Sequence, residues 1–542
     1  MKKFLAIAAS LLLVGSFSTP AQSAGTTYMV NQKTLATFNG SSTTLTYQQK
    51  AQVRATVEAN PFAEKFICTG IRYYSQPMSV NIMVRKRAKE ACAYAKQLNP
   101  NLSTWYQNKP TKARSYAGKV LLTVKSPAPT QDPSPSSVEA CKLPDTRSSA
   151  ERALWRGEKV DGVIGKNNIG FPVTDRGQLP TMGKANIIIA KVAWNDAPPD
   201  PRLPENYLQT ETKKLTDLSR FWSQGKFEYE FQVVEEWVEI DADHADYSLN
   251  NFEKGTEHEE DVYARAEKTY EDIARLVVAN LPDDLNYAAA DIIVAYMTPT
   301  ITEFALSIGW SNGFLDTPDG PLQIPFMANG NNRAEKKQWP YTWTWLAHDF
   351  LHYQGLNEHA PGNGWSTSIQ GGAYVTETGR STILSVWDGF LLGWIDDDQV
   401  FCAEKSDLTR PVKTALTALE VPGGELKTAI VPLGGSRAIV IESRRPVGYS
   451  SSWPKSFNGL LVYEIDVDAV HVDHGPNSCR NSRNNPKWAY YLLPDGAVDK
   501  CNDPEPYFVR LGDTLTFDGV RVKLNQQTST VDYISIERWG DG

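Results

Sequence analysis

Residues 345–359 read Trp345-Leu-Ala-His-Asp-Phe-Leu-His-Tyr-Gln-Gly-Leu-Asn-Glu-His359, and the expected fold follows from this stretch. His348 and His352 are four residues apart, so on a helix both imidazoles project from one face and can reach one metal ion. Gly355 tolerates the left-handed conformation that ends a helix and turns the chain back. The stretch therefore predicts a helix with a metal-binding face, followed by a tight turn.

A third metal ligand is expected soon after this turn, because a catalytic zinc site has three protein ligands and one open position. Glu358 lies ten residues after His348 and is the first candidate, and the adjacent His359 is the alternative. Asp349 lies between the two histidines without being a proposed ligand, which makes it the candidate catalytic base. The competing interpretation is a pair of partly buried helix histidines that bind carboxylates and no metal.

The sequence on either side of this stretch predicts an α+β multidomain protein. Ala185 to Ala193 and Ala290 to Tyr296 are nearly continuous apolar runs, typical of buried strands, and 259–280 has helical periodicity. We expect one domain over 140–405. After that, short strands separated by turns predict a β-rich, sandwich-like region over 406–542.

The N-terminal part divides into three segments. Residues 1–23 have the features of a secretory signal peptide: two lysines, an apolar run and small residues before a cleavage site after Ser23 or Ala24. Residues 24–125 predict a small α/β module, with helices expected at 48–60 and 80–98. Proline and serine dominate 126–139, which predicts a linker. The protein is therefore expected to be secreted.

Cysteine usage and charge limit the possible partners. Six cysteines in an exported chain favour disulfides. Proximity favours the pairs Cys68–Cys92 and Cys479–Cys501, which leaves Cys141–Cys402. A net charge of −8 argues against a nucleic-acid partner. Beyond the N-terminus, no apolar run is long enough for a membrane span.

Over residues 185–470 the sequence resembles the secreted immune-inhibitor-A-like zinc metallopeptidases. The helix of that family reads H-E-x-x-H-x-x-G-x-x-D, and this chain has His348, Asp349, His352, Gly355 and Glu358 at those positions. Three further stretches are similar to family segments: Phe221 to Phe227, Ser385 to Ile395 and Gly459 to Ile465.

This resemblance implies a zincin-like domain at 140–405, a bound Zn²⁺ and hydrolysis of extracellular proteins or peptides. Aspartate replaces the glutamate base of the family at Asp349, which implies a weakened enzyme. The alternative is an inactive relative that binds a cell wall or another surface. In the stretch Ser385 to Ile395, which follows the histidines in the sequence, Trp387 and Trp394 are expected in the core. Asp396 to Asp398 is expected to be a solvated acidic loop, with a Ca²⁺ site as the alternative.

Residues 24–125 resemble the outer-membrane-protein-A-like peptidoglycan-associated domain. The similar stretches are Phe66-Ile-Cys-Thr-Gly70, Val84-Arg-Lys-Arg-Ala88 and Cys92-Ala-Tyr94. In that family an arginine binds a wall-peptide carboxylate, and Arg87 matches it, which implies peptidoglycan as a partner and cell-wall association. The aspartate that accompanies this arginine is missing after Gly70. A solvated helix face at 85–87 and an inhibitory propeptide remain as alternatives.

Overall fold

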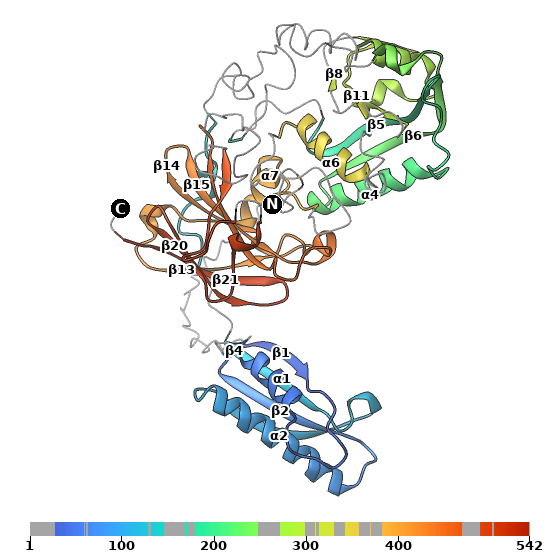
Figure 1. The fold of residues 1–542 in the computed structure, drawn as a ribbon. Helices are drawn as coiled ribbons and strands as arrows, with labels where there is room; N and C mark the ends of the chain where they lie inside the picture. The colour runs from blue at the N-terminus through green and yellow to red at the C-terminus, as the bar shows by residue number, and fades with distance from the viewer. Residues whose placement is uncertain are drawn as a thin grey trace, which may run out of the picture. The chain divides into compact units, whose positions relative to one another are not determined.

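The structure is a computed structural model that describes residues 28–58, 60, 63–127, 132–145, 169–171, 179–247, 271–298, 309–310, 314–329, 342–356, 369, 382–468, 488–500 and 503–540. It is a mixed α+β, multidomain chain with two compact units, Met1–Pro129 and Thr130–Gly542 (Figure 1). The expected signal peptide lies outside the described residues. None of the helices in the described ranges is long and apolar enough to cross a membrane.

The N-terminal unit is a four-stranded sheet in the order β1-β4-β2-β3, with two helices packed on it. Strand β2 pairs in parallel with β3 and antiparallel with β4. A disulfide between Cys68 of β2 and Cys92 of α2 confirms that expected pair. The strands are β1 (Tyr28–Thr34), β2 (Lys65–Tyr73), β3 (Ser103–Thr111) and β4 (Val120–Pro127), and the helices are α1 (Tyr47–Glu58) and α2 (Met78–Leu98).

The second unit begins with a five-stranded sheet in the order β6-β5-β7-β11-β8, in which only the edge strand β8 is antiparallel. Parallel strands are normally covered on both faces, which explains the nearly continuous apolar run in β5. The strands are β5 (Gly183–Trp194), β6 (Phe227–Ile240), β7 (Ile292–Met297), β8 (Gly309–Trp310) and β11 (Phe326–Asn329), and a separate hairpin joins β9 (Leu315–Thr317) to β10 (Gly320–Leu322).

Helices cover both faces of this sheet. Helices α4 (Tyr207–Trp222) and α6 (Thr342–Tyr353) share a core with one face, where Ile187 and Ile189 of β5 point. The helical residues 271–280 pack against the other face, with Ile188 and Ala190. The alternation of side chains along β5 therefore supplies two separate cores.

The C-terminal part is a sandwich of two sheets, as the sequence predicted. A six-stranded sheet, in the order β12-β14-β15-β16-β17 with β18 beside β16, shares one core with a four-stranded sheet, β13-β21-β20-β19. Its opposite face joins the core that contains α6 and α7 (Val386–Leu391). The strands are β12 (Val400–Cys402), β13 (Val412–Thr417), β14 (Thr428–Gly434), β15 (Arg437–Arg444), β16 (Gly459–Asp466), β17 (Ala489–Tyr491), β18 (Phe508–Val509), β19 (Thr514–Phe517), β20 (Val520–Gln527) and β21 (Val531–Arg538).

Residues 132–141 lie along this sandwich. The backbone N–H of Ser136 donates to the carbonyl of Cys402, and Asp132 accepts from the backbone N–H of Lys413. The Cys141–Cys402 disulfide confirms the second expected pair. Part of the segment expected as a linker is therefore bound to the second unit, while Cys479 and Cys501 lie outside the described residues.

Candidate metal centre

Helix α6 carries the two histidines, and α4 positions its first turn. The buried carboxylate of Glu211 accepts a hydrogen bond from the backbone N–H of Trp343 at 3.1 Å. An acceptor there satisfies a free N–H of the first turn and complements the helix dipole. The hydroxyls of Tyr207 and Thr342 are 2.5 Å apart. Two side chains of α4 thus hold the start of α6.

The end of α6 is fixed by a Schellman motif. The N–H of Leu356 donates to the carbonyl of Leu351 at 3.0 Å, and the N–H of Gly355 donates to the carbonyl of His352 at 2.9 Å. Gly355 has φ 94°, so the expected left-handed glycine is confirmed. Leu351 and Leu356, the positions of the apolar contact usual in this motif, are both buried in one core. The last turn that carries His352 is therefore well defined.

The two imidazoles face one another. The Nε2 atoms of His348 and His352 are 3.1 Å apart, and the ring planes are perpendicular. Each Nδ1 faces a backbone carbonyl: that of Ile369 at 3.0 Å for His348, and that of Leu356 at 3.2 Å for His352. His348 is buried, with 3% of its surface exposed. Both rings are thus oriented through Nδ1 and converge through Nε2.

These three contacts need more protons than two neutral imidazoles have. A neutral imidazole carries one N–H, so two rings can supply only two of the three contacts with a donor. If both protons lie on Nδ1, two Nε2 lone pairs meet at 3.1 Å. If one proton moves to Nε2, that ring's Nδ1 lone pair faces a carbonyl oxygen. A cation at the Nε2 atoms, either a metal ion or an added proton, removes the conflict.

The arrangement fits a metal ion. Metal-binding histidines usually donate their other N–H to a carbonyl or carboxylate, which is what Ile369 and Leu356 accept here. Two Zn–N bonds at a tetrahedral angle would place the nitrogens about 3.3 Å apart, close to the separation of the two Nε2 atoms. His348, Asp349 and His352 offer ligand atoms within 4.8 Å of one another, and they are the only such group in the described part of the chain.

Three of the predicted site residues are therefore brought together: His348, Asp349 and His352. Asp349 is buried, with 9% of its surface exposed. Glu358 and His359, the candidates for the third ligand, lie outside the described residues. Sequence reasoning did not find Ile369, which has no recognisable signal because it contributes through its backbone.

The stretch Ser385 to Ile395 shares a hydrophobic core with α6. Trp387 and Trp394 are fully buried, and their indole N–H groups donate to the carbonyls of Ile169 and Thr181. Ile369, which contacts His348, also donates its N–H to the carbonyl of Ile383. Both tryptophans are core residues, as the sequence predicted, and Ile369 links His348 to the backbone just before this stretch.

A buried cluster of charged residues lies next to α7. Arg444 donates to Glu420 at 2.8 Å and to Glu442 at 2.9 Å, and all three side chains have 0% exposure. Asp388 of α7 lies near Glu442 and accepts from the hydroxyl of Ser385 at 2.7 Å. Burial, opposed by Ser385 and assisted by Glu442, raises the pKa of Asp388 to about 7. No sequence signal pointed to this cluster.

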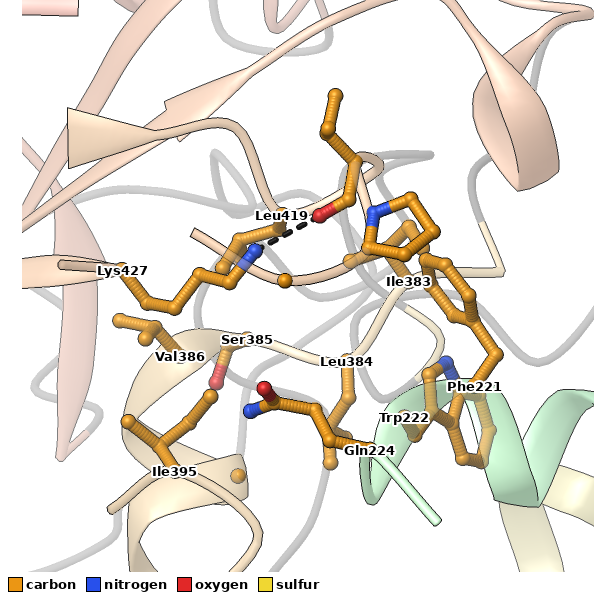
Figure 2. Close-up of a pocket in the computed structure, with 14 residues that line it drawn as sticks. Phe221, Trp222, Gln224, Ile383, Leu384, Ser385, Val386, Ile395, Leu419 and Lys427 are labelled. Atoms are coloured by element: carbon orange, nitrogen blue, oxygen red, sulfur yellow. Dashed lines mark hydrogen bonds between the residues drawn. The ribbon is translucent and has the colours of Figure 1, made fainter. Parts of the chain in front are cut away.

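A small pocket lies where the end of α4, residues 383–389 and the sandwich loops meet (Figure 2). Lys427 extends into it and donates to the carbonyl of Val421 at 2.7 Å. Burial lowers the pKa of Lys427 to about 8. The cavity, of about 40 Å³, is too small for a peptide. Neither histidine of α6 lines it.

The acidic turn at Asp396 to Asp398 has ion-pair partners in the structure. In the acidic turn, Asp396 pairs with Lys226 at 2.8 Å, and Asp397 pairs with Lys142 at 2.9 Å. These carboxylates do not form a group that could share Ca²⁺ within the described residues. Asp396 also caps the short helical turn Asp397–Gln399. The turn is therefore stabilised by ion pairs and a cap.

Arg87 does not lie on a solvated helix face, so that alternative is wrong for this residue. Only 2% of its surface is exposed, and it donates to the backbone carbonyls of Gly40, Ser42 and Gly118. Its guanidinium also lies over the ring of Phe38. Arg87 therefore fastens a loop to the N-terminal unit.

No protein-family model and no curated protein matches the chain. Among solved structures, the chain is similar to the OmpA-like domain of FopA1 from Francisella tularensis subsp. tularensis SCHU S4. The identity is 15%, the match covers 19% of this chain and 82% of that domain, and the TM-score is 0.16.

Proposed function

We propose that the unit Thr130–Gly542 is a secreted zinc metallopeptidase of weakened activity, acting on proteins or peptides. His348 and His352 hold the metal through Nε2, with Glu358 as the third ligand and His359 as the alternative. The observation that carries the proposal is the proton shortage between the two imidazoles, because a metal ion at the Nε2 atoms completes all three contacts.

In this proposal the backbone carbonyls orient the histidine ligands and Asp349 transfers the proton. When bound, zinc polarises a carbonyl group and lowers the pKa of water beside it. The carbonyls of Ile369 and Leu356 hold the two ring tautomers, so both Nε2 atoms stay available. The carboxylate of Asp349, within 4.8 Å of the ring nitrogens, accepts a proton from the attacking water and passes it to the leaving amine.

A second function has one observation in its favour. Aspartate is a methylene shorter than the glutamate base of the family that the sequence resembles, so Asp349 can fall short of the water that it must deprotonate. In that case the protein is an inactive relative that keeps its metal and binds a cell wall or another surface. Metal content alone does not separate the two functions, whereas peptidase activity does.

The first experiment measures metal in the purified full chain by elemental mass spectrometry. We expect about one equivalent of zinc, and less than about a tenth in His348→Ala and His352→Ala, because two remaining ligands rarely retain zinc. His244→Ala is the matched control: His244 lies in the same unit and pairs with Asp196 at 2.8 Å. It should keep the metal.

Glu358→Ala and His359→Ala then assign the third ligand, since only one of them should lose zinc. Circular dichroism of each metal-free variant checks that the unit is still folded. Full zinc occupancy in both histidine variants would overturn the site, as would loss of zinc from the control alone.

A further inference from the structure

The net charge of −8 is the sum of a basic N-terminal part and an acidic remainder of the chain. Residues 28–127 contain fifteen lysines and arginines but only three acidic residues, a net charge of +12. Residues 130–542 contain 38 basic and 60 acidic residues, a net charge of −22. At least twelve cations of the N-terminal unit therefore have no acidic partner within it. A unit with this net charge attracts polyanions.

Within the described N-terminal unit, the two helices cover one face of the sheet. Cys68 of β2 is bonded to Cys92 of α2, and Phe66, Leu122 and Val124 share a core with both helices. Because side chains alternate along a strand, the odd-numbered residues of β2 point to the opposite face. A hydrogen bond between Thr69 and Gln107 places β3 residues of the same parity on this face.

The strand register gives the layout of that face. One row across the sheet runs Gln32, Thr123, Ile67 and Trp105, and the next runs Thr34, Leu121, Thr69 and Gln107. Lys65 and Lys125 lie opposite one another at one end, and Lys109 lies toward the other end. Trp105 is 66% exposed. None of the three acidic residues of 28–127 lies on this face.

We propose that this face binds an anionic polysaccharide, such as a polyuronate. The exposed indole of Trp105 offers a flat apolar surface for a sugar ring. The exposed amides of Gln32 and Gln107 lie in the same two rows and can exchange hydrogen bonds with sugar hydroxyls. The lysines at the two ends lie where a chain that crosses Trp105 would present carboxylates.

Two observations favour a glycan over a nucleic acid. Proteins that stack bases on a sheet use two or three aromatics, whereas Trp105 is the only exposed aromatic in the two central rows. The Cys68–Cys92 disulfide is typical of an oxidising compartment, where polysaccharides are the abundant polyanions. The proposal does not depend on the metal site.

The test measures binding of the full chain to alginate oligomers by calorimetry. A neutral glucan and a single-stranded oligonucleotide of equal length serve as comparison ligands. We expect alginate to bind more tightly than either and its affinity to fall with salt. Trp105→Ala should weaken alginate binding about tenfold or more, as should the double change Lys109→Glu with Lys125→Glu.

The matched control is Lys86→Glu with Lys89→Glu, two exposed residues of α2 on the helix side of the sheet. It makes the same change in charge and should alter affinity no more than about twofold. Equal weakening by the control pair would overturn the sheet face as the site. Tighter binding of the oligonucleotide, or no alginate binding at low salt, would overturn the glycan. Unchanged melting temperatures exclude unfolding as the cause.

Discussion

The histidine pair on α6 and the Arg444 cluster both place polar groups in the interior of the same unit, but only the Arg444 cluster pairs its charges internally. Arg444 has a carboxylate on each side, Glu420 and Glu442, at hydrogen-bonding distance. The three ring-nitrogen contacts of His348 and His352 described above share only two protons when both rings are neutral. A buried group with all its partners stabilises the fold, whereas a shortage of protons between two imidazoles is relieved by a cation, either a metal ion or an added proton.

Breaking the Arg444 cluster should have the largest effect on the free energy of unfolding. Arg444→Met removes the cation that bridges two buried carboxylates, and breaking one buried ion pair already costs about 3–5 kcal/mol. With Glu420 and Glu442 both left unpaired, we expect a loss of about 5 kcal/mol in the free energy of unfolding, measured by urea denaturation.

His348→Gln in the metal-free protein is the contrasting variant. It should change the stability by less than about 1 kcal/mol, because the pair makes a repulsive contact when no cation is present. If Arg444→Met proves mild and His348→Gln severe, the two regions have been assigned the wrong roles.

A second prediction uses the acid next to the cluster. The folded chain binds the proton of Asp388 more tightly than the unfolded chain, since its pKa is about 7 when folded. Stability from this group is therefore full below about pH 4 and declines until about pH 7, by up to about 4 kcal/mol. Asp388→Asn keeps an acceptor for Ser385 and should remove this decline.

The measurement is the free energy of unfolding of the two proteins between pH 4 and pH 8. The gain from Asp388→Asn should grow as the pH rises. A constant difference across this range would show that Asp388 is already ionised in the fold, and that the cluster tolerates another negative charge.

The helix that carries the histidines was predictable because its signals are local. The spacing of His348 and His352 and the glycine at 355 act within a few turns, and the structure has both the helix and the left-handed residue. The Arg444 cluster was not predictable, since its members become neighbours only when β15 and the loop at Glu420 pack together. Buried charges give no periodicity that a sequence reveals.

A stronger local signal was missed in the sandwich. Strands β19 and β20 form a hairpin, which the sequence analysis did not predict. Asp518 and Gly519, both with positive φ, form its turn, and an Asp-Gly pair between alternating residues is a strong hairpin signal. In the N-terminal unit, β3 lacks such a signal, because its residues are mostly polar and exposed.

Lys427 is intermediate between the Arg444 cluster and the histidine pair. Its ammonium group donates to one backbone carbonyl in a mostly apolar pocket. Because its pKa is about 8 in the fold, the unfolded chain holds this proton more tightly. Stability should therefore rise with pH between about 8 and 10.4, by about 3 kcal/mol. Lys427→Met should be the more stable protein at pH 7, and this advantage should disappear by about pH 10 in paired denaturation curves. A constant advantage would mean that Lys427 is charged in the fold throughout.

The smallest expected effect is a change in peptidase activity, and it tests whether the histidine pair belongs to a catalytic site. Aspartate withdraws its carboxylate by roughly 1.5 Å relative to glutamate, and a misplacement of about 1 Å can cost a hundredfold in rate. Asp349→Glu restores the longer side chain next to an unchanged pair of histidines, so zinc content should stay the same. Hydrolysis of unfolded casein should rise about tenfold, or about 1.4 kcal/mol of barrier. Asp349→Asn serves as the control, since it keeps the size of the side chain and removes the base. If the glutamate and aspartate forms both bind zinc and neither cleaves casein, the cation completes the helix without catalysing a reaction. Higher activity in the aspartate form would show instead that the backbone around α6 has moved to suit the shorter base.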